Sequence, residues 1–262
     1  DVLQVISYLA SQVLFTGTLA GGTLSHGGTT IATIDGFEAI SISTGLGDDS
    51  LVGGSGDDTI SAGSGGNTVA TGAGNDQVSF GADASLDRIY LGTGAEDHVI
   101  ITYGGLNGDI SFELSGNADL LIGGARVANV RGAERVTLFT GLGNDRGVGG
   151  ALADSFFGGQ GSDEFVGNAG DDLFQLSVDA LADTVFGGAG NDRLSVFAGS
   201  DALFTDLGTP GRVLIRSGGE VLIQRSFLIS NEADNGDGGA IYNAGKLHIE
   251  LSSIGSNIAG GA

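Results

Sequence analysis

The sequence has no cysteine, no tryptophan and no methionine, and only one proline and one lysine among its 262 residues. Without cysteine no disulfide can form, so stability outside a cell would have to come from another source. The absence of methionine indicates that residue 1 is not a native start, and residues 1–30 lack the basic and then apolar pattern of a signal peptide. No stretch is long and apolar enough to span a bilayer, so we expect no membrane insertion.

Basic residues are also scarce, with 10 against 32 acids and a formal net charge of −22. A general nucleic-acid binder needs a basic face for the phosphates, so we expect no nucleic-acid partner. Bound divalent cations would explain how a compact chain tolerates this charge, and a thinly spread surface charge is the alternative. Glycine supplies 51 residues, yet 40% of the chain is hydrophobic, which argues against a disordered linker and for turns in an ordered β structure.

The glycines are concentrated in two runs of nine-residue blocks. Residues Thr44–Ser79 read TGLGDDSLV, GGSGDDTIS, AGSGGNTVA and TGAGNDQVS. Residues Thr140–Gln175 read TGLGNDRGV, GGALADSFF, GGQGSDEFV and GNAGDDLFQ. Each block has a glycine-rich opening, carries Asp or Asn at the sixth place, and in all but one case has an apolar residue at the eighth place. An uninterrupted period of this kind indicates a repeat architecture.

The two runs start 96 residues apart, and TIDGFEAISIST (33–44) stands at the same offset from NVRGAERVTLFT (129–140). This offset divides the chain into a first long repeat (1–96, with its run over 44–100) and a second (97–192, with its run over 140–195). A partial third copy or transition (193–225) and a final stretch (226–262) follow. Asp1 falls opposite Asp97, in a block without its glycine-rich opening, so we expect a section of a longer tandem array.

Between the runs, short β-branched segments are broken by glycine or asparagine, which predicts strands and little or no helix. The predicted fold is all-β: a right-handed parallel β-solenoid in which two blocks complete one turn, so that block i stacks on block i+2. Eighth-place side chains, such as Phe156, Phe165 and Phe174, would point inward. Gly147 at an eighth place and Leu152 at a fourth place would weaken their blocks.

This stacking would bring sixth-place carboxylates within one strand spacing, about 4.8 Å, of each other. The predicted pairs are Asp58 with Asp76, Asp145 with Asp163, Asp154 with Asp172, Asp76 with Asp97, Asp163 with Asp183, and Asp172 with Asp192. Unpartnered carboxylates would repel, whereas Ca²⁺ accepts six to eight carboxylate and backbone oxygens. Mg²⁺ suits such a site less well because it demands a tight octahedron. Asn67 lacks the charge, so the sites that it shares with Asp49 and Asp87 should be weaker.

The sequence thus predicts several Ca²⁺ ions bound at the turns. The predicted side-chain ligands are Asp49, Asp58, Asn67, Asp76, Asp87, Asp97, Asp145, Asp154, Asp163, Asp172, Asp183 and Asp192. The predicted backbone ligands are Gly45, Gly47, Gly54, Gly56, Gly72, Gly74, Gly141, Gly143, Gly159, Gly161, Gly170, Gly188 and Gly190.

The pattern resembles the GGxGxDxUx nonapeptides of the RTX family, although the runs here are short. The resemblance implies a Ca²⁺-binding parallel β-roll, an extracellular or cell-surface location, and export in an unfolded state with folding on meeting Ca²⁺ outside. The final stretch, which contains GGAIYNAGKLHIELSSIGSNIAGGA, resembles the wide right-handed parallel β-helix repeats of large bacterial surface and exported proteins.

No catalytic residue is predicted, and we expect no enzyme. His26, His98 and His248 are scattered without an HExxH motif, no GxSxG motif surrounds a serine, and nearly every Asp is explained by the turns. The arginines, among them Arg126 and Arg131, are interpreted as single counter-charges.

The leading hypothesis is a calcium-dependent structural module of a large secreted or cell-surface bacterial protein, such as a surface-layer, fibre or adhesin-type rod. Its partners would be calcium and, as an open alternative, copies of itself or neighbouring repeats of the same long chain. A second hypothesis is an accessory region of a secreted polysaccharide-active enzyme (lyase or epimerase) or a secretion module of an exported enzyme. A third is carbohydrate binding along one face, for which four Tyr and no Trp offer few stacking platforms.

Overall fold

The computed structural model of the protein describes residues 2–6, 13–18, 21–27, 29–103, 107–177, 181 and 183–196, and beyond these only the strands between 202 and 259. All regular elements in these ranges are β-strands, which confirms the all-β prediction. In the part of the chain so described, there is no helix long and apolar enough to cross a membrane.

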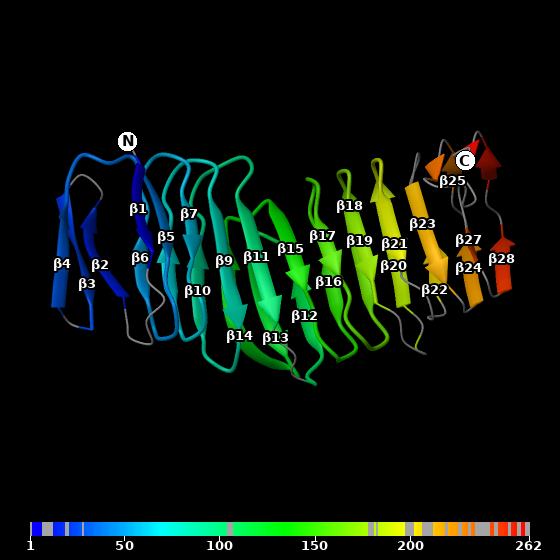
Figure 1. Cartoon of the computed structure of the whole chain (residues 1–262), viewed down its shortest axis with the longest axis horizontal. Coiled ribbons are helices and arrows are strands. Elements are labelled where there is room, and N and C mark those ends of the chain that lie inside the picture. Colours follow the sequence, from blue (N-terminus) through cyan, green and yellow to red (C-terminus); the bar gives the residue numbers. More distant parts are fainter. Residues whose placement is uncertain are drawn as a thin grey trace. The chain divides into compact units, whose positions relative to one another are not determined.

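The first of two compact units covers residues 1–104 and 112–137. Its first parallel ladder runs in the order β1–β5–β7–β9–β11. These strands are β1 (Val2–Ile6), β5 (Ala39–Ser43), β7 (Thr59–Ser61), β9 (Gln77–Ala82) and β11 (His98–Tyr103). Figure 1 shows β5, β7, β9 and β11 side by side.

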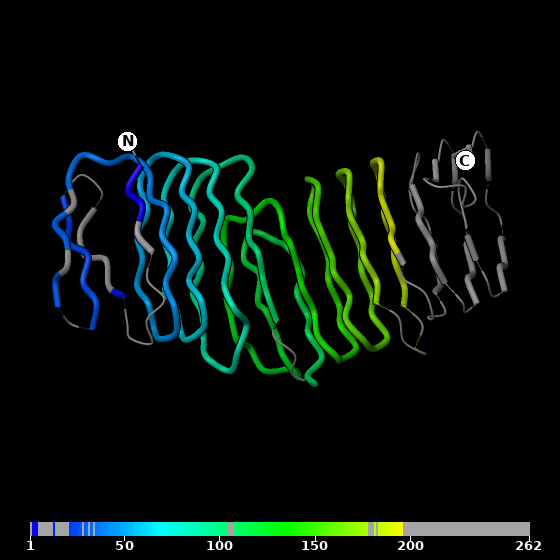
Figure 2. Tube along the Cα trace, viewed as in Figure 1, coloured from blue at the N-terminus to red at the C-terminus, as the bar shows by residue number. Residues whose placement is uncertain are grey.

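The second parallel ladder of this unit takes the blocks in between, in the order β2–β6–β8–β10–β14. These strands are β2 (Val13–Thr18), β6 (Ser50–Val52), β8 (Thr68–Ala70), β10 (Asp87–Tyr90) and β14 (Ala125–Arg131). Because successive blocks alternate between the two ladders, block i pairs with block i+2, as the sequence predicts. Figure 2 shows the trace passing back and forth between them over residues 37–103.

Antiparallel strands interrupt the parallel pattern in the strand-rich segments, where the sequence predicts only parallel coils. β3 (Gly21–His26) pairs antiparallel with β2 and with β4 (Thr29–Ile34), and β13 (Asn117–Ile122) pairs antiparallel with β14. Gly123 and Gly124 join β13 to β14 with φ angles of 56° and 79°. A two-residue loop with positive φ at both positions is the type I′ hairpin turn, and this turn reverses the chain.

The second unit covers residues 105–111 and 138–262 and repeats the two-ladder arrangement. One ladder contains β17 (Ser155–Phe157), β19 (Leu173–Leu176), β21 (Arg193–Val196), β23 (Arg212–Ser217) and β27 (Tyr242–Asn243). The other contains β16 (Arg146–Val148), β18 (Glu164–Ala169), β20 (Asp183–Ala189), β22 (Ala202–Thr205), β24 (Glu220–Gln224) and β28 (Lys246–Glu250).

The remaining strands are short pairs or lie at the sequence boundary between the units. β25 (Phe227–Ile229) pairs parallel with β29 (Ser253–Gly255), and β26 (Glu232–Ala233) pairs parallel with β30 (Ile258–Ala259). β12 (Ile110–Glu113) and β15 (Arg135–Phe139) each contain residues of both units. Because two parallel ladders run through each unit, each unit is a parallel β-solenoid.

Strand positions follow the 96-residue offset seen in the sequence. β3 to β10 and β13 to β20 start 96 residues apart, pair by pair. The antiparallel segment and the nonapeptide run after it therefore recur together. The division of the chain into long repeats at 1–96 and 97–192 remains a sequence prediction, because the compact units have other boundaries.

The core of each unit is a column of eighth-place side chains. Leu51, Ile60, Val69 and Val78 fill it in the first unit. In the second, Phe156 stacks on Phe165 at a centroid distance of 5.2 Å and on Phe174 at 5.5 Å. A Cβ atom on Gly147 would lie 2.8 Å from the ring of Phe156 and 2.9 Å from that of Phe165. The missing side chain at this eighth place is therefore compensated by its aromatic neighbours.

We expect Gly147→Ala to lower the free energy of unfolding by about 1–3 kcal/mol, the usual cost of overpacking a filled core. Chemical denaturation in calcium-containing buffer would measure it. Gly116→Ala is the matched control, because a Cβ atom there would meet nothing within 4 Å. A Gly147→Ala variant as stable as this control would show that the rings do not fill the space.

Candidate metal centre

The sixth-place side chains are inside the solenoid rather than on an outer rim. The sixth place precedes the eighth by two residues, and side chains two apart on an extended chain point to the same face. Asp87 and Asp97 are 0% exposed, and no sixth-place residue exceeds 3%. Each nonapeptide run therefore buries a column of carboxylates beside its column of apolar side chains.

These carboxylates are joined into a ladder of side-chain-to-backbone hydrogen bonds. The N–H of Asp58 donates to Oδ1 of Asp76 over 2.8 Å, and the N–H of Asp154 donates to Oδ1 of Asp172 over 2.8 Å. The same bond links Asp49 to Asn67, Asn67 to Asp87, Asp76 to Asp97, Asp145 to Asp163, Asp163 to Asp183, and Asp172 to Asp192. Every stacked pair predicted from the sequence is thus a pair of hydrogen-bonded neighbours, and the role of these residues as metal ligands remains a prediction.

Residues of the strand-rich segments begin and end these ladders. The N–H groups of Ile40 and Ile110 donate to Oδ1 of Asp58 and Asp145 over 2.7 and 2.6 Å. At the other end, the N–H of Asp97 donates to Oε2 of Glu134 over 2.9 Å. Sequence reasoning missed Glu134, although it precedes β-branched and apolar residues much as a sixth-place Asp does.

Fifth-place residues form a second ladder that runs in the opposite direction. The N–H of Asn75 donates to Oδ1 of Asp57 over 2.8 Å, from the later block to the earlier one. Equivalent bonds join Gly66 to Asp48, Ala95 to Asn75, Ser162 to Asn144, and Asn191 to Asp171. These residues were not predicted from the sequence, where the frequent Asp or Asn at the fifth place was the available signal.

The second- and fourth-place glycines let successive turns stack closely. Gly72 and Gly74 have φ angles of 116° and 124°, which side-chain-bearing residues rarely adopt. A Cβ atom on Gly72 would overlap the carbonyl oxygen of Gly54, and one on Gly74 would lie 2.6 Å from that of Gly56. Carbonyl oxygens of one turn therefore lie directly against the next turn. The same contact recurs at the other predicted backbone ligands. The carbonyl oxygens of five of them lie against the next stacked block: Gly45, Gly47, Gly141, Gly143 and Gly170. The other four face a carbonyl oxygen of the stacked block before them: Gly159, Gly161, Gly188 and Gly190.

The second carboxylate oxygen, Oδ2, lacks a hydrogen-bond donor in several blocks. Oδ2 of Asp58 and Asp154 accepts the N–H of the second-place glycine of its own block, over 2.8 and 2.6 Å. In other blocks Oδ2 is buried without any hydrogen-bond partner in the described structure. These blocks are those of Asp49, Asp76, Asp87, Asp97, Asp172 and Asp192. A buried carboxylate oxygen without a donor is costly unless a proton or a cation neutralises it.

Burial accordingly raises the pKa of these carboxyl groups, although backbone N–H bonds oppose the shift. The pKa reaches about 7 for Asp87 and Asp172 and about 6 for Asp58 and Asp97. Burial also raises the pKa of Asp49, Asp145 and Asp192. The N–H bonds alone therefore do not compensate for burying the charge.

Asn67 shows what the second atom of a sixth-place residue faces. Its Oδ1 accepts the N–H of Asp49, as an Asp would, while its Nδ2 donates to the carbonyl oxygen of Gly65 over 3.0 Å. A fourth-place carbonyl is thus available to a donor beside the sixth-place side chain. In a block with Asp, an acceptor replaces this donor, and a cation would satisfy both oxygens.

The donor set fits Ca²⁺ only if backbone oxygens take part. No group of three or more His, Cys, Asp or Glu side chains that could hold a metal occurs among the residues described. Carboxylates and closely approaching carbonyls are nevertheless the ligands that Ca²⁺ prefers. His98 does not contribute: burial lowers its pKa to about 4, and its Nε2 lies 2.9 Å from the hydroxyl of Thr137.

In excess chelator, we expect the thermal midpoint to fall as the pH rises from about 4 to about 7.5. The folded-state pKa values of about 6 and 7 exceed the ordinary value of 3.8, so in this interval the folded chain holds protons that the unfolded chain has lost. Thermal melts followed by far-UV circular dichroism would test this. A midpoint that stayed constant or rose with pH would contradict the uncompensated burial of these groups.

One comparison with known proteins, the match to a protein-family model, agrees with this geometry. No curated protein is significantly similar to the chain in sequence. A family model described as "RTX calcium-binding nonapeptide repeat (4 copies)" matches residues 43–78, 137–174 and 179–209. The first two matches coincide with the runs whose carboxylates form the buried ladders, and binding of Ca²⁺ is implied by this family. The chain therefore carries RTX calcium-binding nonapeptide repeats, folded as a parallel β-solenoid.

Proposed function

We propose that the chain is a calcium-dependent structural module of a large secreted or cell-surface bacterial protein. The observation that carries the proposal is the column of buried sixth-place carboxylates, several of which have an Oδ2 atom without a donor. Ca²⁺ between stacked turns would neutralise this column and so make folding depend on the ion.

The sixth-place carboxylates and the carbonyl oxygens of the second- and fourth-place glycines would hold the ions. Bound Ca²⁺ would supply positive charge where Asp87, Asp97 and Asp172 have none. Ions that bind only the folded chain stabilise it by an amount that grows with the free ion concentration. With site dissociation constants on the order of 10⁻⁴–10⁻³ M, as in extracellular modules, folding would follow the calcium level outside the cell.

A structural rather than catalytic role is supported by how the acids are used. Asp58, Asp76 and Asp97 each accept a backbone N–H through Oδ1, so they act as ties between coils. The parallel ladders leave each coil in contact mainly with its neighbours, which is how solenoids extend as rods. Surface-layer, fibre and adhesin-type proteins are the settings that such a rod would suit.

In excess chelator at pH 7.5, we expect a far-UV circular dichroism spectrum with little β signal, and a gain of β signal when Ca²⁺ is added. The buried ionised carboxylates would otherwise lack compensation. Mg²⁺ at the same concentration should produce less of this gain, because it resists dehydration. A chelated spectrum identical to that with Ca²⁺ would defeat the proposal.

Exchanging Asn and Asp at the sixth place should have opposite effects with and without calcium. In chelator, Asn67→Asp should destabilise by about 1–3 kcal/mol as the pH rises toward about 7, because the ionised carboxylate has no donor for the Gly65 carbonyl and leaves a buried acceptor unpaired. In Ca²⁺ the same variant should bind at least as many ions, more tightly. Asp172→Asn should do the reverse, with higher stability in chelator and weaker Ca²⁺ binding.

Calorimetric Ca²⁺ titration and chemical denaturation would measure both variants. Asp35→Asn, which changes an exposed carboxylate outside the runs, is the control for net charge. If Asn67→Asp and Asp172→Asn shifted calcium affinity no more than this control does, the sixth-place residues would not be ligands.

A further inference from the structure

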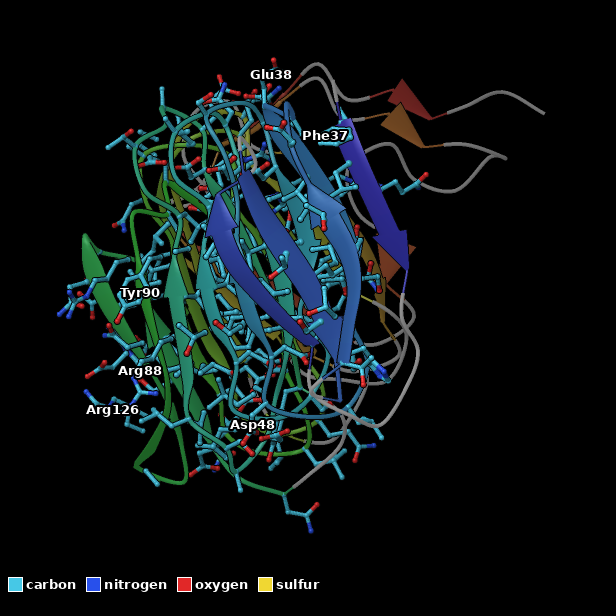
Figure 3. The ribbon with its side chains drawn as sticks, turned by 90° about the vertical axis from the view of Figure 1, so that its left-hand side faces the viewer. Phe37, Glu38, Asp48, Arg88, Tyr90 and Arg126 are labelled. Atoms are coloured by element: carbon cyan, nitrogen blue, oxygen red, sulfur yellow. The ribbon has the colours of Figure 1, made fainter. Side chains whose placement is uncertain are left out.

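A polar hollow lies on the outer face of β10, β13 and β14, within the first unit. The parallel register of β10 on β14 and the antiparallel register of β13 on β14 align these strands in two cross-strand rows. The rows are Arg88–Asn129–Asp119 and Tyr90–Arg131–Asn117. Figure 3 shows the labelled Arg88, Tyr90 and Arg126 on the same outer side. This face is distinct from the buried carboxylates, which point into the solenoid.

The hollow concentrates positive charge in a chain that has little. Arg88, Arg126 and Arg131 line it, and Asp119 is the only acid among the lining residues. The whole chain has 10 basic residues against 32 acids. Charges farther apart than about 8 Å are largely screened at physiological ionic strength, so this local excess governs what binds here.

The arginines are held so that hydrogen-bond donors remain available. Nε of Arg131 donates to Oδ1 of Asn117 over 2.8 Å and of Asn129 over 3.1 Å, and its guanidinium carbon lies 5.4 Å from the centroid of the Tyr90 ring. The terminal nitrogens of Arg131 and the whole guanidinium of Arg88 have no partner among the described residues. A guanidinium fixed through Nε still offers its two terminal NH₂ groups to an anion.

The single acid of the hollow is already engaged. Oδ1 of Asp119 accepts Nδ2 of Asn129 over 2.7 Å and lies 3.6 Å from a terminal nitrogen of Arg126. Its charge is thereby partly neutralised, which leaves Arg88 and Arg131 facing the solvent without a counter-charge. Oδ1 of Asn117 already accepts Nδ2 of Asn129 and Nε of Arg131, so the Asn129 carbonyl, the Tyr90 hydroxyl and Asp119 add acceptors for the hydroxyl groups of a ligand, and the Asn117 amide adds its NH₂ donor.

The size and polarity of the hollow narrow the class of ligand. Its volume of about 200 Å³ lies below the roughly 300 Å³ at which sites for drug-sized molecules begin. Its lining is polar apart from Leu86, and the large exposed hydrophobic side chains of the described structure (Val2, Leu46, Leu142 and Leu181) lie elsewhere. Protein–protein contacts normally centre on buried apolar side chains, and the lining of this hollow offers only Leu86. A small anion with several hydroxyl groups matches the lining better.

We propose that this hollow binds an anionic saccharide unit. The carboxylate or sulfate of the sugar would pair with Arg88 and Arg131, and its hydroxyl groups would bond to Asn117, Asn129 and Tyr90. Carboxylate and sulfate both accept paired N–H donors, so the shared chemistry is an acidic group on a hydroxylated ring.

Isothermal titration of the full chain at saturating Ca²⁺ tests the proposal with three probes: a uronate-containing disaccharide, its sulfated form, and lactose as the neutral disaccharide. We expect at least one acidic probe to bind and lactose not to bind. Arg88→Ala and Arg131→Ala should each weaken binding about tenfold, the usual effect of losing hydrogen bonds to a charged group. Asp119→Asn should strengthen binding because it removes the only negative charge. Arg193→Ala, an exposed arginine of β21, should change nothing.

Because Arg88 has no partner in the described structure, Arg88→Ala should keep the circular dichroism spectrum and calcium response of the parent. Equal binding of lactose and the acidic probes would overturn the proposal, as would an equal loss in Arg193→Ala. So would failure of both acidic probes to bind the correctly folded chain. If Arg88→Ala instead reduced self-association measured by sedimentation while no probe bound, the hollow would be a contact between copies.

Discussion

The burial of negative charge in a column is the constraint on which the rest of this structure depends. The sixth-place carboxylates are enclosed by the coil, and a backbone N–H from the neighbouring coil supplies one donor to most of them, as Ile40 does to Asp58 and Asp154 does to Asp172. Asp76, Asp97 and Asp172 have no second donor. The glycine turns, the three-residue strands and the nine-residue period all serve to stack such carboxylates at one strand spacing. The charge of such a column is neutralised only where protons or cations bind to the carboxylates.

The two kinds of ladder divide the work of holding the coils together. The sixth-place ladder is buried, and burial raises the pKa of several of its carboxyl groups, whereas the fifth-place ladder, with Asp57 and Asn75 among its members, is exposed to solvent. The apolar column contributes independently of both, and in the second unit it adapts its shape, since Phe156 and Phe165 occupy the space left by Gly147. A block can therefore carry a different residue at its fifth, sixth or eighth place as long as the other two places keep their contacts with the neighbouring coils.

Much of this arrangement was predictable because the nine-residue period is strict. The alternation of blocks between two ladders, the inward eighth place and the stacked sixth-place pairs all follow from period and strand geometry. The antiparallel segments were not predictable from the β-branched runs, which predict strands without their direction; the Gly27–Gly28 and Gly123–Gly124 pairs were the available hairpin signals. Glu134 and the fifth-place residues were missed because their roles depend on backbone N–H groups of distant coils. The hollow was missed because Arg88 is far in sequence from Arg126 and Arg131 and meets them only through the pairing of β10 with β14.

The position of Glu134 at the end of a ladder has a consequence for how such a chain can grow. The bond from Ile40 to Asp58 opens one series, and the bond from Asp97 to Glu134 closes it, so this series has its own first and last member. The strand-rich segment that supplies the last member is the one that precedes the next run. A gene duplication that copies the segment and the run together would therefore give every new ladder its own last acceptor, equivalent to Glu134. Lengthening by whole repeats would then be tolerated, whereas adding or deleting a single block would shift every later carboxylate onto the opposite side of the coil.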